Sequence, residues 1–185
     1  LLGGFNVYNA LAAICVGLSE GVSLDICSRA LKKAKGIAGR MEVVVKKPFT
    51  VIVDYAHTPE QLESVYKSLR EKPLICVLGS CGGGSDKWKR PVLGKIAKDY
   101  CKEVIITNED PYDENPMKII EDVAGGTDGK AQKILDRREA ISEALKSATP
   151  YDAVVITGKG SEPWMCVKNG GKIPWDYCQM AREEL

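Results

Sequence analysis

The sequence predicts an α/β protein with a mainly parallel sheet and helices on both of its faces. Three observations support this fold class. Short, nearly continuous apolar runs recur along the chain and alternate with segments of helical periodicity. These runs have the length and character of strands that are buried on both sides. A polar or glycine-containing segment follows several of the runs, as is common where parallel strands end.

Two helices are expected before the sheet begins. Within residues 5–35, apolar side chains recur at helical spacing in two stretches, and Gly21 separates them. The second stretch starts near Ser23. Gly36 and Gly39 then mark a connector, after which the pattern changes to that of strands.

A hairpin and a capped helix are expected next. Residues 41–45 and 49–53 are rich in β-forming side chains and flank a Lys-Pro pair, which suggests a hairpin. Thr58 and Gln61 then have the spacing of a capping box, and Pro59 occupies the first helical position. We therefore expect a helix to begin at this point.

The rest of the chain alternates between the two kinds of element. Further strands are expected at residues 74–78, 103–107, 131–135 and 153–157. Further helices are expected at residues 91–100, from Asn115-Pro116 onward, at 137–148 and at 175–183.

The composition excludes several classes of protein. The chain has 185 residues, of which 44% are hydrophobic and 28% charged, which suits one well-packed globular domain with a small appendage. The net charge of +1 gives no field that favours nucleic acid or a membrane surface. No apolar run approaches the roughly 20 residues that span a bilayer. Because the chain starts at Leu1 with no methionine and no basic leader, we expect a piece of a longer protein without a signal peptide.

The cysteines and the single histidine do not suggest a metal site. The seven cysteines are odd in number, form no CxxC pair and in several cases lie inside apolar runs. We interpret them as buried free thiols in a reducing cytoplasm. His57 is the only histidine, which excludes a His-rich zinc site within this chain.

Four loops follow the expected strands and hold nearly all the unusual chemistry of the sequence. They are residues 54–58, 79–90, 108–115 and 158–163. Because ligands gather at the carboxyl ends of parallel strands, we expect these loops to lie along one rim of the sheet.

Taken singly, each loop has an ordinary explanation beside the functional one. Gly82-Gly83-Gly84 leaves backbone amides open to an anion, but a flexible connection explains it equally well. Asp54 could accept hydrogen bonds from a ribose, and His57 could bind a phosphate or simply cap and pack. The acidic segment 108–114 could bind an ammonium group or be a solvated loop. No GxxxxGK[ST] or GxGxxG pattern occurs.

Taken in order, the segments resemble the Mur ligases, and the resemblance spans essentially the whole chain. The matching motifs are Gly-Phe-Asn-x-Tyr-Asn from Gly4, Gly-Arg-Met-Glu from Gly39, Asp-Tyr-Ala-His-Thr-Pro from Asp54, Gly-Gly-Gly-x-Asp-Lys-x-Lys-Arg-Pro from Gly82, Asp110-Pro111, and Thr-Gly-Lys-Gly-x-Glu from Thr157. The similarity is greatest to the UDP-N-acetylmuramoyl-tripeptide ligases, which add the third amino acid of the peptidoglycan stem peptide.

The resemblance implies a three-domain ligase of which this chain is the end. Residues 1–37 resemble the closing helices of a central ATPase domain, and residues 38–185 a complete, Rossmann-like third domain. The family's P-loop, magnesium ligands and carbamylated lysine belong to the missing domains. The resemblance thus implies ATP and Mg²⁺ as cofactors, a cytoplasmic location, and no catalysis by this chain alone.

Family roles carry over to the matching positions. Asn9, supported by Asn6, resembles the residue that contacts adenine. Arg40 resembles an arginine that reaches the nucleotide when the third domain closes. Asp54 resembles the ribose ligand, and His57 a group near the phosphates.

The remaining implied roles concern the incoming amino acid. Gly158 and Glu162 match positions that hold it, and the glutamate takes its distal amine. Diaminopimelate-adding enzymes carry two arginines for the distal carboxylate, where this chain has Tyr112 and Ser85. Asp110 and Glu162 favour a cationic side chain. We therefore expect lysine or another diamine to be preferred to diaminopimelate.

The implied reaction joins this amino acid to UDP-MurNAc-dipeptide through an acyl phosphate. The third domain would hold the amine and swing onto the ATPase domain, with the connector from Gly36 to Gly39 as the hinge. Two related ligases, cyanophycin synthetase and folylpolyglutamate synthetase, share the domain plan and stay open as alternatives. A binding module that never catalyses is an alternative from another class.

Overall fold

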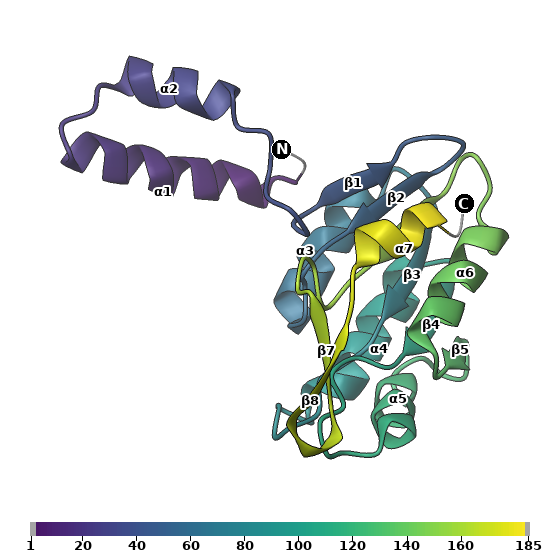
Figure 1. Cartoon of the computed structure of the whole chain (residues 1–185). Coiled ribbons are helices and arrows are strands. Elements are labelled where there is room, and N and C mark those ends of the chain that lie inside the picture. The colour runs from purple at the N-terminus through teal and green to yellow at the C-terminus, as the bar shows by residue number, and fades with distance from the viewer. Residues whose placement is uncertain (1–2, 184–185) are drawn as a thin grey trace.

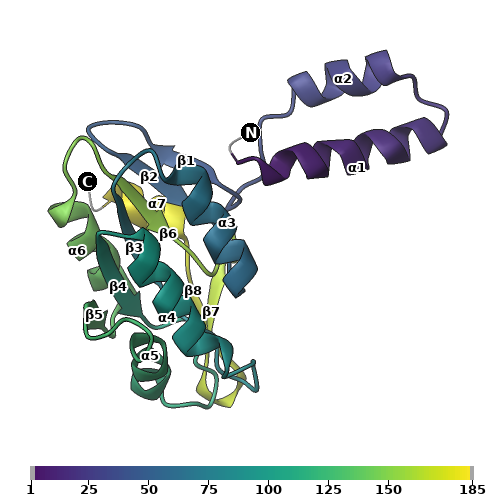
Figure 2. The ribbon, with the colours of Figure 1, turned by 180° about the vertical axis from the view of Figure 1, so that it is seen from behind.

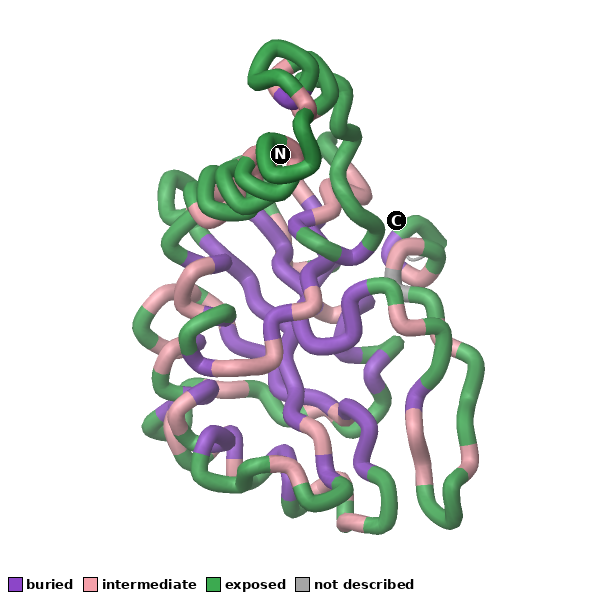
Figure 3. The backbone as a smooth tube through the Cα atoms, turned by 90° about the vertical axis from the view of Figure 1, so that its left-hand side faces the viewer, coloured by how far each residue is buried: buried purple, intermediate pink, exposed green. Residues whose placement is uncertain are grey.

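The computed structural model describes residues 3–183, except for the side chain of Tyr177, and the four terminal residues lie outside the described part. The chain opens with α1 (Phe5–Ser19) and α2 (Leu24–Lys32), which pack on each other as a helical hairpin. This hairpin projects from the rest of the molecule (Figure 1). No residue of α1 is buried, and the exposed backbone of both helices contrasts with the buried sheet (Figure 3).

The main sheet has six strands in the order β1-β2-β6-β3-β4-β5. The strands are β1 (Glu42–Val45), β2 (Thr50–Val53), β3 (Leu74–Leu78), β4 (Glu103–Thr107), β5 (Ala131–Ile134) and β6 (Ala153–Ile156). Every neighbouring pair is parallel except β1 and β2, which form the expected antiparallel hairpin. The predicted fold class is therefore confirmed.

Helices cover both faces of this sheet (Figures 1 and 2). One face packs against α3 (Pro59–Leu69), α4 (Lys89–Tyr100) and α5 (Pro116–Ala124), and the other against α6 (Arg137–Ser147) and α7 (Tyr177–Glu183). Because successive strand residues point to opposite faces, β3 contributes Cys76 to the first core and Ile75 and Val77 to the second. A continuous apolar run is thus buried on both sides.

Side-chain caps set the starts of several helices where the sequence indicated them. Thr58 accepts a hydrogen bond from the Gln61 amide at the start of α3, and Asn115 accepts from two amides at the start of α5. The Gln61 side chain reaches back to the His57 amide, one residue before the cap. Helix α4 begins at Lys89 rather than at Pro91, since a proline within the first turn needs no helical hydrogen-bond acceptor.

A small second sheet was not predicted from the sequence. It pairs β7 (Trp164–Val167) with β8 (Gly171–Pro174) in antiparallel register. The turn contains Asn169 and Gly170, both with positive φ (59° and 70°). Asn-Gly is a strong hairpin signal and could have revealed this element. Helix α7 consequently begins at Tyr177 rather than at residue 175.

The cysteines agree only in part with the interpretation as buried thiols. All seven are free, but Cys15 is exposed and only Cys27 and Cys76 are buried, with the others half-buried. Within residues 3–183, no helix combines the length and apolar character needed to cross a bilayer.

Candidate nucleotide and amino-acid site

The four loops predicted to converge do so along the carboxyl edge of the parallel strands. The register pairs the last residue of β6, Ile156, with Val53 of β2 on one side and with Val77 of β3 on the other. Beyond the strand ends, the Gly82 amide donates to the Asp110 carbonyl at 2.9 Å. We call the loops 54–58, 79–90, 108–115 and 158–163 the rim. The geometric prediction on which the sequence interpretation depended is confirmed.

Arg137, the first residue of α6, holds two of these loops together. Its guanidinium donates to the Asn108 carbonyl at 2.9 Å and to the Thr157 carbonyl at 2.6 Å. It also lies 3.7 Å from the Glu109 carboxylate, and both side chains are almost fully buried. Burial raises the pKa of Glu109, and the charge of Arg137 opposes that rise. The Arg137–Glu109 pair thus holds the carboxyl ends of β4 and β6 in place next to the rim.

Gly158 sits directly above Glu109. Its φ of 114° lies in the region that favours glycine, and a Cβ at this position would overlap the Glu109 carboxylate. The structure therefore gives Gly158 a steric reason to be glycine, whatever ligand the loop holds.

Lys159 occupies the centre of the rim. Its ammonium lies 2.5 Å from Asp110 Oδ2 and 2.5 Å from Glu162 Oε2. Burial alone would lower the pKa of Lys159, but these hydrogen bonds raise it above its ordinary value. We call Lys159, Asp110 and Glu162 the Lys159 cluster. The two carboxylates that we expected to attract an external cation are thus already paired with a cation of the same chain.

Asp110 is further fixed by the second sheet. Its Oδ1 accepts from the Cys166 amide of β7 at 2.7 Å, and its backbone adopts a positive φ of 39°. Glu162 differs, because its side chain is 42% exposed. Burial would raise the pKa of Glu162, but hydrogen bonds from Lys159 and Tyr55 lower it. Of the two carboxylates, Glu162 is the one that a ligand can reach.

Tyr55 links the Lys159 cluster to the connector. Its hydroxyl donates to Glu162 Oε1 at 2.7 Å, and the Arg40 guanidinium stacks 4.1 Å above its ring. The hydrogen bond to Glu162 and burial raise the pKa of Tyr55 to about 12. His57 packs edge-on against the same ring, with its Nδ1 3.1 Å from the Tyr55 carbonyl oxygen.

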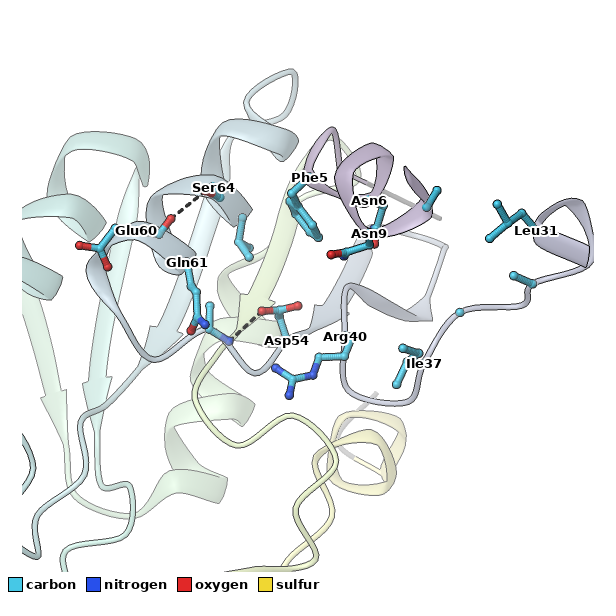
Figure 4. Close-up of a pocket in the computed structure, with 15 residues that line it drawn as sticks. Phe5, Asn6, Asn9, Leu31, Ile37, Arg40, Asp54, Glu60, Gln61 and Ser64 are labelled. Carbon is cyan, nitrogen blue, oxygen red and sulfur yellow. Dashed lines mark hydrogen bonds between the residues drawn. The ribbon is translucent and has the colours of Figure 1, made fainter. Parts of the chain in front are cut away.

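A cavity of about 710 Å³ lies where the helical hairpin and the connector meet α3. Asn6, Asn9, Arg40 and Asp54 all line it, and Figure 4 shows these side chains around one space. The cavity walls are mostly apolar, and its volume falls within the usual range for small-molecule sites, about 300–1,000 Å³. Four of the five residues assigned to the nucleotide are thus brought together. His57 is not among the residues that line the cavity.

Asp54 already has hydrogen-bond donors on both of its oxygens. Its Oδ2 accepts from the Met41 amide and its Oδ1 from the Ala56 amide, each at 2.7 Å. A carboxylate offers about four acceptor positions, so a sugar hydroxyl can still bind. Asn9 donates to Asn6 across one turn of α1 at 3.1 Å, which aligns the two amides along the cavity wall.

The connector is anchored at one of its two glycines. Gly39 is buried with a φ of 65°, and a Cβ there would overlap the backbone of Gly160 and Ser161. The predicted hinge therefore has its fixed end at Gly39, on the loop that carries Lys159. Gly36 is exposed, with a φ of 101°.

Ser85 and Tyr112 both lie on the rim. Tyr112 is 39% exposed, and its ring lies against Gly83. Its hydrogen bond with Cys166, together with burial, raises the pKa of Tyr112 to about 12, and the charge of Asp110 contributes to this rise. Ser85 closes the glycine loop through a hydrogen bond from its amide to the Gly82 carbonyl at 3.2 Å.

The glycine loop has a packing reason for two of its three glycines, since a Cβ at Gly83 would meet the Tyr112 ring. A Cβ at Gly82 would overlap the Pro111 carbonyl, whereas Gly84 has open space around it. Among the described residues, no group of three or more His, Cys, Asp or Glu side chains is arranged to hold a metal ion.

Several residues of the site were not given roles from the sequence. Tyr55 and Lys159 lie inside the recognised motifs and Glu109 lies in the acidic segment 108–114, and these patterns indicated a site without revealing which side chains pair. Arg137 carried no signal, because an arginine at a helix start is common and its partners lie in distant loops.

Comparison with known proteins identifies the family. Residues 39–160 match the family described as "Mur ligase, glutamate ligase domain". A 2,6-diaminopimelate-adding UDP-N-acetylmuramoyl-L-alanyl-D-glutamate ligase of Aquifex aeolicus is 43% identical over the whole chain, which covers 39% of that relative. A UDP-N-acetylmuramyl-tripeptide synthetase of a Roseiflexus species is 41% identical, again over the whole chain and 38% of the relative. The chain thus spans about two fifths of the length of these curated relatives.

Solved structures agree with the sequence relatives. A 2,6-diaminopimelate ligase structure superposes with a TM-score of 0.74 at 35% identity, covering all of this chain and 39% of that one. A Mycobacterium tuberculosis folylpolyglutamate synthase, solved with ADP and AMPPCP, shares the fold at 23% identity with a TM-score of 0.68, over 85% of this chain and 38% of that one. With a family match over most of its length and relatives above 40% identity, the chain belongs to the Mur ligase family.

Proposed function

We propose that this chain is the nucleotide- and amino-acid-contacting end of an ATP-dependent ligase that extends UDP-MurNAc-dipeptide by one amino acid. The observation that carries the proposal is the placement of two sites side by side. The cavity holds Asn6, Asn9, Arg40 and Asp54. The Lys159 cluster lies next to it, with Tyr55 in contact with both. The names of the relatives support the substrate class.

The proposed roles of the separate domains follow from the share of the relatives' length that this chain covers. Residues 1–37 would close a central ATPase domain, and residues 38–185 would form the third domain. The missing domains would bind the UDP-sugar, the phosphates and Mg²⁺, so that this chain alone binds nucleotide weakly and does not catalyse. The location would be the cytoplasm, where ATP and UDP-sugars are found.

The chemistry proposed for the whole enzyme passes through an acyl phosphate. The carboxylate of the peptide would attack the γ-phosphate of ATP and release ADP. An amine would then attack the acyl phosphate, and a tetrahedral intermediate would collapse to the amide and inorganic phosphate. The residues of this chain would hold the adenosine part of the nucleotide in the cavity and present the amine from the rim. Closing the third domain over the site would also exclude water from an intermediate that hydrolyses readily.

For the amino acid, we propose a diamine such as lysine in preference to diaminopimelate. Tyr112 and Ser85 stand where arginines would bind a distal carboxylate, and neither offers a cation. The Lys159 cluster sums to one negative charge and leaves Glu162 accessible, which favours one distal ammonium group. The names of several relatives point instead to diaminopimelate. Our preference for a diamine rests on the residues of this chain.

An amino-acid panel with the full-length protein tests the proposal. The protein would be given UDP-MurNAc-dipeptide, ATP, Mg²⁺ and lysine, ornithine, diaminopimelate or alanine in turn. Formation of the extended product and of ADP would be measured together. We expect turnover with lysine or ornithine to exceed turnover with diaminopimelate, and alanine to give none. Higher turnover of diaminopimelate would overturn the substrate preference, and no ligation at all would overturn the ligase assignment.

Folylpolyglutamate synthesis has less support as the activity of the whole protein. Folylpolyglutamate synthases share the fold at 23% identity, which is a likeness of architecture alone. The relatives above 40% identity are named for cell-wall peptide synthesis. Including folate and its glutamates in the panel distinguishes the two directly.

A further inference from the structure

The Tyr55 side chain contacts both a cavity-lining residue, Arg40, and the Lys159 cluster. It comes from the loop that follows β2, between the buried residues Asp54 and Ala56. Its ring carries the Arg40 guanidinium 4.1 Å from the ring centroid. Its hydroxyl, at the edge of the same ring, donates to Glu162 Oε1 at 2.7 Å.

We propose that Tyr55 is a positioning residue for both sites, its ring fixing Arg40 at the nucleotide cavity and its hydroxyl fixing Glu162 at the amino-acid site. The inference rests on the proposed function, because it assigns those two sites to nucleotide and amino acid. It goes further because it assigns a role to Tyr55, a motif residue to which the family resemblance gave none.

Glu162 needs such a support, because it is the most exposed member of the Lys159 cluster. Its side chain is 42% exposed, whereas those of Lys159 and Asp110 are 2% and 7% exposed. One carboxylate oxygen accepts from Lys159 and the other from Tyr55. With both oxygens engaged, the plane of the carboxylate is fixed, and the loss of either donor would release it to other rotamers.

Arg40 depends on Tyr55 in a different way. It is exposed and lines the cavity, and among the described residues no ion pair is recorded for its guanidinium. The contact with the Tyr55 ring holds the Arg40 guanidinium by cation–π attraction. The ring alone supplies this contact, and the hydroxyl is not required.

Tyr55 is itself held firmly enough to serve as a support. Its Cβ packs close to Gly160, so close that a side chain at that glycine would displace it. The His57 ring packs edge-on against the other side at 5.0 Å between centroids. Because its pKa is about 12, the hydroxyl stays protonated at neutral pH and remains a donor.

Two substitutions separate the two supports. Tyr55→Phe removes the hydroxyl and keeps the ring, and Tyr55→Leu removes both. In the full-length enzyme we expect Tyr55→Phe to raise the KM for the amino acid about tenfold, the effect of one lost charge-assisted hydrogen bond, and to leave the KM for ATP unchanged. Tyr55→Leu should raise both KM values. Tyr151→Phe is the matched control, since Tyr151 is 81% exposed and precedes β6, at the opposite end of that strand from the rim, and it should change neither.

A double variant tests whether the hydroxyl acts through Glu162. In a Glu162→Ala background, adding Tyr55→Phe should cause no further rise in the amino-acid KM. Thermal unfolding of each variant checks that the fold is retained. An unchanged amino-acid KM in Tyr55→Phe, or an equal change in both KM values, would overturn the inference while leaving the ligase assignment intact. A wild-type protein that ligates no amino acid would overturn both.

Discussion

Lys159 and Asp110 form a buried ion pair across the rim, with Nζ 2.5 Å from Oδ2 and side-chain exposures of 2% and 7%. The two residues come from loops after β6 and β4, which are not neighbouring strands, because β3 lies between them. The pair therefore ties together the two sides of the parallel sheet at its functional edge. It also means that the rim carries its own internal cation.

Removing this cation should destabilise the protein strongly. Lys159→Met leaves the Asp110 carboxylate buried without its partner, which we expect to cost about 3–5 kcal/mol of the free energy of unfolding. Chemical denaturation at neutral pH measures this change in the free energy of unfolding. The exposed Lys168, changed to Met, is the control and should cost less than about 0.5 kcal/mol. Lys159→Met combined with Asp110→Asn should recover much of the loss, because Asn still accepts from the Cys166 amide. Equal effects for Lys159→Met and the control would show that the pair adds no stability.

Acid should weaken the opposite end of the sheet through Asp152. Burial would raise the pKa of Asp152, but hydrogen bonds from Lys102 and Thr149 lower it below its ordinary value of 3.8. A depressed folded-state pKa contributes stability that is present above 3.8 and lost as the pH falls through the folded value. Asp152→Asn should therefore cost about 1 kcal/mol at neutral pH, and that difference should shrink below this window.

The measurement for Asp152 is denaturant unfolding of wild type and variant across the acid range. Lys102→Met removes one donor and keeps Thr149, so its cost should have the same sign and be smaller. A difference between wild type and Asp152→Asn that stays constant with pH would contradict the assignment.

Gly158 should tolerate alanine far less well than an unconfined glycine of the same backbone class. Gly129 also has a positive φ, of 78°, but has open space around it. Gly129→Ala then reports backbone strain alone, about 1 kcal/mol, and Gly158→Ala should cost roughly 2 kcal/mol more because the methyl group meets Glu109. Thermal or chemical unfolding compares them. Trimming Glu109 to Ala should reduce the extra cost of Gly158→Ala, and no such coupling would mean that the loop relaxes by another route.

Substrate choice should respond to arginines at the two rim positions that lack them. Tyr112→Arg, alone and with Ser85→Arg, should raise the ratio of kcat/KM for diaminopimelate to that for lysine by about tenfold or more, the effect of one bidentate carboxylate contact. Steady-state kinetics of the full-length enzyme measure the ratio. Tyr151→Arg adds the same charge far from the rim and should leave it unchanged. A similar rise of this kcat/KM ratio in Tyr151→Arg would mean that the added net charge, and not a carboxylate contact, causes the change.

Much of the fold was predictable because it depends on local patterns. The apolar runs gave the parallel strands, and the cap residues Thr58 and Asn115 gave the starts of α3 and α5. The convergence of the rim followed from one topological rule applied to those strands. The β7–β8 sheet escaped prediction because both strands are only four residues long and β8 is mostly exposed without an apolar pattern, although β7 is an apolar run.

The partners within the rim were not predictable in the same way. Acidic residues at 108–114 indicated a place for a cation, but which cation depends on loops that meet only in the folded chain. Lys159 belongs to the next motif, and nothing local shows that its side chain turns inward to Asp110. Arg137 reaches its two carbonyl partners from a helix start that looks ordinary in sequence. Pattern reasoning located the site, and three-dimensional packing decided its charges.

The direct backbone contact between Gly39 and Gly160 has a consequence for engineering this family. Two segments of main chain touch there, with no room for any side chain between them. Recombining ligases by exchanging their terminal modules should therefore succeed only when the crossover lies before Gly39, so that both touching segments come from one parent. A crossover placed between them would join surfaces that were never selected to fit.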